Sequence, residues 1–256
     1  MSRKPLLPLA VLVMAFAGHA GYVVAQQGSS VNAAIAAAVA DPARPETDRA
    51  RDADRKPAEV IAFAGIKPGS RVSEFSPGGG YFTRIFSGVV GSTGIVNALA
   101  QTRPANAPPP TGPTPSETLA ATPGYSNVRV ITMDALAASN DLSDFVWTSL
   151  NYHDMHNRPN ADLVAFNKQV LSLLKPGGIY IVIDHAAQTG SGKRDTGTLH
   201  RIDPDLVKSE AVSAGFEFVG ESDVLRNPAD AKDKGVREVP RGKTDQFVYK
   251  FRKPAR

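Results

Sequence analysis

The chain of 256 residues contains no cysteine. This absence excludes disulfides, thiolate metal sites and a cysteine nucleophile. Excess charge of one sign is also lacking, because 29 basic residues face 25 acidic ones and the basic residues form no run. The composition therefore gives no argument for a nucleic-acid partner. Long apolar runs are confined to the N-terminal segment, so no membrane span is expected once that segment is removed.

The N-terminus has the pattern of an export signal. A short basic start, Ser2-Arg3-Lys4, precedes an apolar stretch from Leu6 to Ala17, and Val23-Val24-Ala25 fits a small-residue cleavage site. We therefore expect residues 1–25 to be a cleaved signal peptide, with the site near Ala25, and the protein to be periplasmic or secreted. An uncleaved N-terminal membrane anchor is the alternative. Gly18-His19 interrupts the apolar run, which favours cleavage.

The composition changes again after the leader. Residues 26–55 are rich in alanine and then densely charged, which predicts a mobile lead-in with at most a short helix over 31–39. Residues 56–256 alternate apolar segments with turn signals and predict a single domain. Within that domain, the segment 101–115 contains six prolines in the twelve residues from Pro104, which predicts an extended surface loop.

Strand-length apolar segments alternate with segments of helical periodicity in this domain. The sequence predicts strands over 71–75, 95–99, 128–133, 145–149, 179–183, 216–221 and 246–251, with helices mainly between them. Such alternation indicates crossover units. The predicted fold class is α/β, a three-layer Rossmann-like doubly wound sheet of about seven strands, mostly parallel.

The most informative segment joins the first predicted strand to the next helix. Three consecutive glycines, Gly78, Gly79 and Gly80, follow Ser76-Pro77 at the carboxyl end of that strand. Glycines there let the backbone approach a ligand where a Cβ would collide, and the next helix offers free N–H groups and a positive dipole end. This arrangement is typical of sites for nucleotide-like cofactors.

Histidines and carboxylates gather where the fourth and fifth predicted strands end. His153-Asp154 follows the fourth strand and Asp184-His185 the fifth, and carboxyl ends of neighbouring parallel strands meet at one edge. Three interpretations stay open: a general base, a metal site of His and Asp ligands, or loops braced by hydrogen bonds. As the main hypothesis we take His153 or His185 as the base, oriented by Asp154 or Asp184, and assign no metal.

Taken together, the glycine turn and the turn Lys175-Pro176-Gly177-Gly178 before the fifth strand resemble the class I S-adenosylmethionine-dependent methyltransferases, over about residues 56–253. Four phrases resemble more narrowly a group of exported bacterial predicted methyltransferases: residues 63–69, 151–154, 184–186 and 199–203. The resemblance implies a sheet with an antiparallel last strand, S-adenosylmethionine as cofactor and an unidentified small molecule as methyl acceptor. It does not indicate an oligomeric state.

The resemblance also implies a set of cofactor-binding residues. The methionine part would lie at Glu74, Ser76, Pro77, Gly78, Gly79, Gly80 and Tyr81, the adenine near Asp134, and Asn151 would lie close to the transferring group. The second strand lacks the acidic residue that holds the ribose in this family, which leaves Asn97 as its replacement. Two alternatives to a methyltransferase remain: a non-catalytic periplasmic binding or scaffold protein on the same fold, and a metal-assisted His/Asp enzyme.

Overall fold

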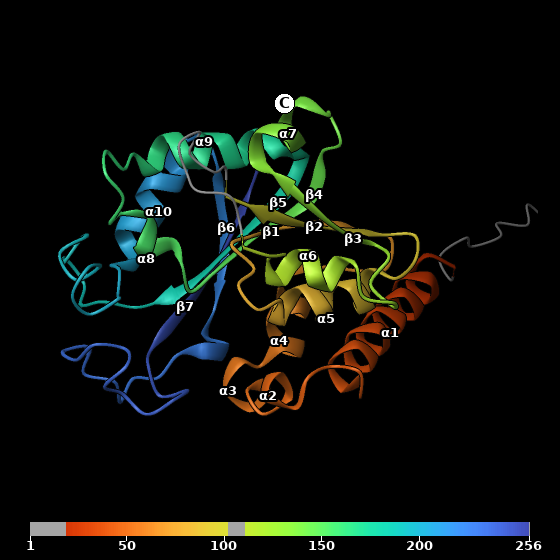
Figure 1. Cartoon of the computed structure of the whole chain (residues 1–256), viewed down its shortest axis with the longest axis horizontal. Coiled ribbons are helices and arrows are strands. Elements are labelled where there is room, and N and C mark those ends of the chain that lie inside the picture. The colour runs from red at the N-terminus through yellow and green to blue at the C-terminus, as the bar shows by residue number, and fades with distance from the viewer. Residues whose placement is uncertain (1–18, 102–110, 256) are drawn as a thin grey trace, which may run out of the picture.

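The computed structural model describes residues 19–101 and 111–255, with side chains from Ser30 onward. Most of the predicted leader and of the predicted proline-rich loop lie outside these residues. The described strands form one seven-stranded sheet, with the order β3-β2-β1-β4-β5-β7-β6 (Figure 1). Their bounds are β1 (Arg71–Phe75), β2 (Ile95–Ala100), β3 (Val128–Thr132), β4 (Ser143–Ser149), β5 (Leu174–His185), β6 (Glu217–Ser222) and β7 (Gln246–Arg252).

The pairing of these strands confirms the predicted fold class. The pairs β1–β2, β2–β3, β1–β4 and β4–β5 are parallel, whereas β7 runs antiparallel to both β5 and β6. The last strand is therefore the antiparallel one, as the resemblance implied. All the parallel strands end at one edge of the sheet, where ligands bind in open α/β folds.

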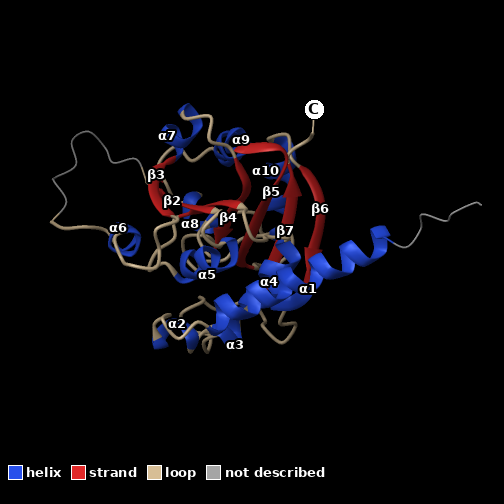
Figure 2. Cartoon of the chain, turned by 90° about the vertical axis from the view of Figure 1, so that its right-hand side faces the viewer, coloured by secondary structure: helices blue, strands red, loops and turns tan. Residues whose placement is uncertain are grey.

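Helices cover both faces of the sheet (Figures 1 and 2). On one face lie α1 (His19–Ala40), α4 (Pro57–Ala64) and α5 (Tyr81–Val90), and on the other α7 (Met133–Ala138), α9 (Leu163–Leu173) and α10 (Pro204–Ser213). The shorter helices are α2 (Glu46–Arg49), α3 (Asp52–Arg55), α6 (Pro115–Ala120), α8 (Tyr152–Met155) and the 3₁₀ turn η1 (Asp223–Leu225).

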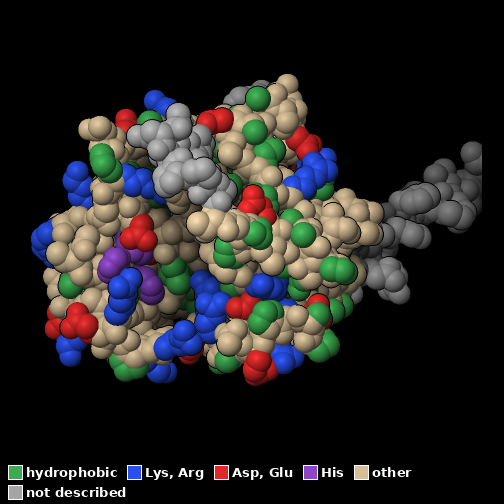
Figure 3. All heavy atoms as spheres, viewed as in Figure 1, with side chains coloured by type: hydrophobic (Ala, Val, Ile, Leu, Met, Phe, Trp, Pro, Cys, Tyr) green, Lys and Arg blue, Asp and Glu red, His purple; other side chains and the backbone are tan. Residues whose placement is uncertain are grey.

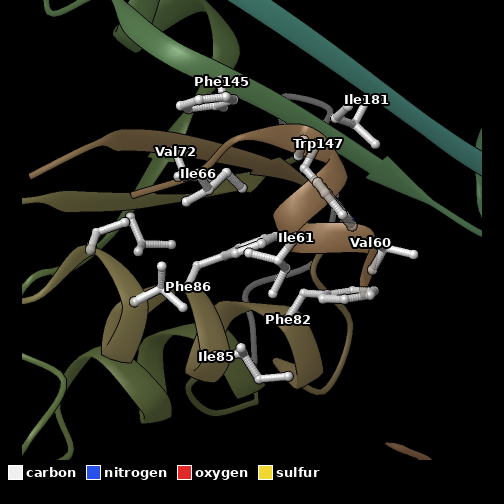
Figure 4. Packing of buried hydrophobic residues seen from close by; sticks show 14 of the residues in the cluster. Val60, Ile61, Ile66, Val72, Phe82, Ile85, Phe86, Phe145, Trp147 and Ile181 are labelled. Carbon is white, nitrogen blue, oxygen red and sulfur yellow. The ribbon is translucent and has the colours of Figure 1, made fainter. Parts of the chain in front are cut away.

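Two hydrophobic cores lie on opposite faces of the sheet because successive strand residues point to opposite sides. Trp147 packs against Phe82 and Phe86 of α5, with ring centroids 4.9 and 5.0 Å away (Figure 4). Its neighbour Val146 belongs to the other core, beneath α9 and α10. Trp147 is therefore a core residue, and it is not available to contact a bound ligand.

The structure differs from the predicted lead-in over 26–55. Ile35 and Ala38 of α1 are buried in the core beneath α5. Gly88 of α5 permits this close packing, since a Cβ on it would lie 2.8 Å from Cβ of Ala38. The small side chains of alanine and glycine let the two helices approach closely. Helix α1 also runs without a break through Ala25, and no described helix is long and apolar enough to cross a membrane.

Candidate active site at the carboxyl edge of the sheet

The glycine turn lies between β1 and α5 and combines open and packed positions. Ser76, Gly78 and Gly80 have left-handed backbones, with φ of 49°, 58° and 83°. A Cβ on Gly78 or Gly79 would meet nothing within 4 Å, whereas one on Gly80 would lie 2.9 Å from Leu119 of α6. Two of the three glycines therefore leave space for a ligand to approach the backbone, and the third is required by packing.

Glu74 lies one residue before the end of β1 and points into the protein. It is 4% exposed, and its Oε2 accepts a hydrogen bond of 2.6 Å from the Thr83 hydroxyl. Burial raises the pKa of Glu74 to about 7, against the opposing effects of the Thr83 hydrogen bond and the charge of Arg55. The carboxyl group is thus already satisfied within the protein.

Tyr81, the first residue of α5, is also held internally. Its hydroxyl donates to Oδ1 of Asp52 at 2.6 Å, and the guanidinium of Arg55 lies 4.4 Å from its ring centroid. A second contact of Arg55, 3.4 Å long, reaches Oγ of Ser149 at the end of β4. Sequence reasoning placed Arg55 in a solvated charged run, and only the packing of α3 against α5 brings it to the site.

The ends of β2 and β3 differ from the prediction. Asn97 lies inside β2, is 1% exposed and donates to Oγ of Ser73 at 3.1 Å, so it does not reach the edge and cannot hold a ribose. Gln101, the first residue after β2, lies at the edge, and its Nε2 is 3.4 Å from Oγ of Ser76. Asp134 is exposed in the first turn of α7, at the end of β3.

Asn151 follows β4 and lies beside the glycine turn. Its amide nitrogen donates to the carbonyl of Phe75 at 3.2 Å and lies 3.5 Å from that of Ser76. Its Oδ1 is buried and has no hydrogen-bond partner among the described residues. A buried acceptor without a partner costs free energy.

The histidines and carboxylates come together at the ends of β4 and β5, as predicted. Nδ1 of His153 donates to Oδ1 of Asp184 at 2.8 Å, and the backbone N–H groups of His153 and His185 also donate to Asp184 at 2.8 Å each. Burial lowers the pKa of His153, but the hydrogen bond and charge of Asp184 outweigh it, so the pKa lies above its ordinary value. Asp184 is fully buried and fixes both histidine segments.

Two further contacts complete this group. Oδ1 of Asp154 lies 3.3 Å from Nε2 of His153 and 3.5 Å from Nδ1 of His200, which comes from the loop between β5 and α10. On the other side of Asp184, Nδ1 of His185 shares a hydrogen bond of 2.9 Å with the hydroxyl of Thr244. His156 lies apart from the group and pairs with Glu210 at 3.2 Å.

A cavity of about 490 Å³ opens beside this group. Its lining includes His185, Leu150 and four arginines, Arg51, Arg55, Arg237 and Arg241, together with Asp54 and other residues between 236 and 246. Figure 3 shows histidine side chains gathered next to a hollow, with Lys and Arg side chains on its other side. Burial lowers the pKa of His185 to about 4, helped by the charges of His153, Arg201 and Arg55 and opposed by Asp184. His185 therefore presents a neutral imidazole at a positively charged cavity.

Comparison with known proteins establishes the fold. No family model matches the chain, and no curated protein matches its sequence. A candidate sarcosine dimethylglycine methyltransferase from Galdieria sulphuraria is 14% identical with a TM-score of 0.55, over 82% of this chain and 88% of the other. The [4+2]-cyclase SpnF is 15% identical with a TM-score of 0.55, over 90% and 95%.

A third solved structure, a SAM-dependent methyltransferase from Aquifex aeolicus, is 17% identical with a TM-score of 0.50, over 86% of this chain and 97% of the other. At these identities the likeness concerns the fold alone. The narrower likeness to an exported bacterial group stays a prediction. In fold, the chain resembles the class I S-adenosylmethionine-dependent methyltransferases, as its motifs predicted.

Proposed function

We propose that the protein is an S-adenosylmethionine-dependent methyltransferase that acts on a small anionic molecule. The observation that carries this proposal is the open glycine turn with the unpaired Oδ1 of Asn151 beside it. The fold alone does not decide the reaction, because one of its structural neighbours is a cyclase. The proposal therefore depends on the site.

The residues of the turn fit the methionine part of the cofactor. The Asn151 amide nitrogen lies 3.2 and 3.5 Å from two main-chain carbonyl oxygens, which leaves Oδ1 as an acceptor without a partner among the described residues. The ammonium group of S-adenosylmethionine is a matching donor. The bare backbone at Gly78 and Gly79 would accommodate the adjacent carboxylate and ribose. When bound, the cofactor supplies an electrophilic methyl group on a sulfonium.

The remaining predicted cofactor contacts need reassignment. Gln101 takes the role predicted for Asn97, because its amide lies at the end of β2, where the family holds the ribose. Glu74 would support the glycine turn from the protein interior, because its carboxyl group is buried against Thr83. Asp134 keeps its proposed place near the adenine, at the end of β3.

The cavity lined by arginines supports the acceptor class. Its lining carries four guanidinium groups against one carboxylate, Asp54. Arg237 and Arg241 form no ion pair within the described part of the chain, so their charges are available to a ligand. Planar guanidinium groups bind carboxylates and phosphates by paired hydrogen bonds. A volume of about 490 Å³ suits a small molecule and not a polymer.

We assign His185 as the general base. It lines the cavity, and its Nε2 makes no hydrogen bond within the described residues, while Nδ1 is held by Thr244. The acceptor heteroatom would give its proton to Nε2 as it bonds the methyl carbon, whose bond to sulfur breaks to leave S-adenosylhomocysteine. His153 is only 3% exposed and lies deeper in the protein than His185. Asp184 accepts hydrogen bonds from the backbone N–H groups of both histidines.

We also propose that the protein is exported and that residues 1–25 are removed. The part of α1 that packs on the core, including Ile35 and Ala38, lies after the proposed cleavage site and would be retained. Mass spectrometry of the protein from the periplasmic fraction of its host tests this. A mature N-terminus near Gln26 is the expected result, and an intact N-terminus would favour the membrane-anchored alternative.

Isothermal titration with S-adenosylmethionine and S-adenosylhomocysteine tests the cofactor. We expect Asn151→Ala to weaken binding about tenfold, the effect of losing one hydrogen bond worth about 1.4 kcal/mol. Asn160→Gly is the matched control, because Asn160 is exposed and has a left-handed backbone that glycine accepts. Release of S-adenosylhomocysteine in the presence of small carboxylates or phosphates then tests the acceptor class.

The internally satisfied Glu74 and Asn97 favour a second candidate, a binding or scaffold protein that has lost the cofactor. The same titration separates the two candidates. If neither ligand releases heat or shifts the melting temperature at millimolar concentration, the scaffold function replaces the enzyme. If the cofactor binds but no methyl group is transferred to any anionic compound, the acceptor class is wrong.

A further inference from the structure

We propose that His153, Asp154 and His200 form a site for a divalent transition metal such as Zn²⁺, with at least one coordination position open. One ligand atom from each of these three residues lies within 4.8 Å of the other two. The proposal does not depend on the methyltransferase function, because it rests on these three side chains alone.

The distances fit metal ligands better than hydrogen bonds. Metal–ligand bonds of about 2.1 Å in tetrahedral geometry place ligand atoms about 3.4 Å apart. Oδ1 of Asp154 lies 3.3 Å from Nε2 of His153 and 3.5 Å from Nδ1 of His200. Both separations are longer than the 2.8 Å hydrogen bond between His153 and Asp184. Asp154 thus lies at a ligand–ligand distance from both histidines.

Asp184 prepares His153 to act as a ligand. A carboxylate only accepts hydrogen bonds, so the bond to Asp184 fixes the proton on Nδ1 and leaves the lone pair on Nε2. Histidine ligands of metals are commonly oriented by a carboxylate in this way, which also raises their basicity. Asp184 itself is fully buried, and the backbone N–H of His153 holds its other oxygen.

His200 is brought to the site by the chain after β5. Ile202 returns to the sheet through a parallel bridge with Ala186, which fixes the loop immediately beyond His200. His200 itself has a left-handed backbone, with φ of 54°. The rings of His153 and His200 lie 5.5 Å apart and nearly perpendicular, so their nitrogen atoms converge on Asp154 instead of stacking.

The composition of the site selects the class of cation. Two imidazoles and one carboxylate, with no thiolate in the chain, suit Zn²⁺, Fe²⁺, Co²⁺ or Mn²⁺ better than Ca²⁺ or Mg²⁺. The side chains of Asp154 and His200 are 55% and 33% exposed, so a fourth ligand has access from solvent. The ring of His153 lies 6.3 Å from that of His185, which places the site beside the cavity.

Metal titration of the full chain, purified without an affinity tag and treated with a chelator, tests the proposal. We expect one equivalent of Zn²⁺ to bind and Co²⁺ to give a ligand-field absorption spectrum. His200→Ala and Asp154→Ala should abolish both signals. Asp184→Asn should weaken binding by 10- to 100-fold, the usual effect of a partner that orients a ligand.

His156→Gln is the control, because His156 pairs with Glu210 outside the group and glutamine can keep a hydrogen bond there. Its metal affinity should equal that of the wild type. A circular dichroism melt of each metal-free variant establishes that it is folded. Binding that is absent in the wild type, or equal in wild type, His200→Ala and Asp154→Ala, would overturn the proposal. Cofactor titration of the same samples reports separately on the methyltransferase function.

Discussion

The carboxyl edge of the sheet has two halves that satisfy their polar groups in different ways. On the cofactor half, which β1 and β2 form, the side chains predicted to bind the cofactor already have protein partners: Glu74 has Thr83, and Asn97, inside β2, has Ser73. On the acceptor half, at the ends of β4 and β5 and the start of β7, Arg237 and the Nε2 atom of His185 have none among the described residues.

This difference indicates how each half would bind its ligand. The cofactor half offers bare backbone and one amide oxygen, so shape and a few hydrogen bonds would determine affinity. The acceptor half offers charge, so electrostatic attraction would determine it. Substitutions of the buried side chains Glu74 and Asn97 in the first half should therefore change stability, whereas substitutions of the charged side chains in the second half should change function while leaving the fold intact.

The largest effect is expected for Glu74→Gln. The pKa of Glu74 is raised from about 4.5 to about 7 in the folded state, so its contribution to stability is fully present below pH 4.5 and is lost as the pH rises through 7. At pH 8 the buried carboxylate costs about 3 kcal/mol. Glutamine keeps an acceptor for Thr83 without the charge, so the variant should be more stable than the wild type at pH 8 by about that amount.

Urea unfolding at pH 5 and pH 8 measures this effect. The difference between variant and wild type should shrink at pH 5, where both side chains are neutral. Glu59→Gln, an exposed position on α4, is the control and should change stability by less than about 0.5 kcal/mol at either pH. A variant that is destabilised at pH 8 would show that Glu74 is stabilised as an anion and that the cofactor half is more polar than described.

The next effect concerns the acceptor half. Replacing Arg237 and Arg241 by alanine removes two exposed guanidinium groups that have no ion pair within the described residues. We expect kcat/KM for an anionic acceptor to fall about 10- to 100-fold, with the cofactor dissociation constant and the melting temperature unchanged. Steady-state kinetics and calorimetry on the same preparation measure all three. A loss of stability or of cofactor affinity would remove the distinction between the halves.

The fold could be predicted from the sequence because periodicity and turn residues are local signals. The strand 71–75 and the helix 81–90 were placed at their observed bounds, because turn residues flank both and the helix has a strong apolar pattern ended by Gly91. The prediction failed where packing outweighed composition. Helix α1 is held on the domain by the contact between Ala38 and Gly88. A contact between two such small residues produces no apolar periodicity in the sequence.

The site was only partly predictable, for a similar reason. The topology brings strand ends together, so His153 and Asp184 could be placed side by side from the sequence. Asn97 was misplaced because it lies inside β2, where its side chain bonds to Ser73 and does not reach the edge. Arg55 and His200 reach the edge through a short helix and a loop, whose paths depend on tertiary contacts, so the sequence did not place them beside the other site residues.

The smallest effect distinguishes two neighbouring glycines of the turn. Gly80 has φ of 83°, and a Cβ on it would lie 2.9 Å from Leu119, so Gly80→Ala should cost about 1–2 kcal/mol of stability. A Cβ on Gly79 meets nothing within 4 Å, so Gly79→Ala should leave stability unchanged or raise it by about 0.5 kcal/mol. That methyl group would instead enter the space proposed for the cofactor and weaken its binding. Urea unfolding and cofactor titration of both variants separate the two roles. If Gly79→Ala binds S-adenosylmethionine like the wild type, the ligand does not lie against the turn, and the free acceptor of Asn151 must serve another molecule.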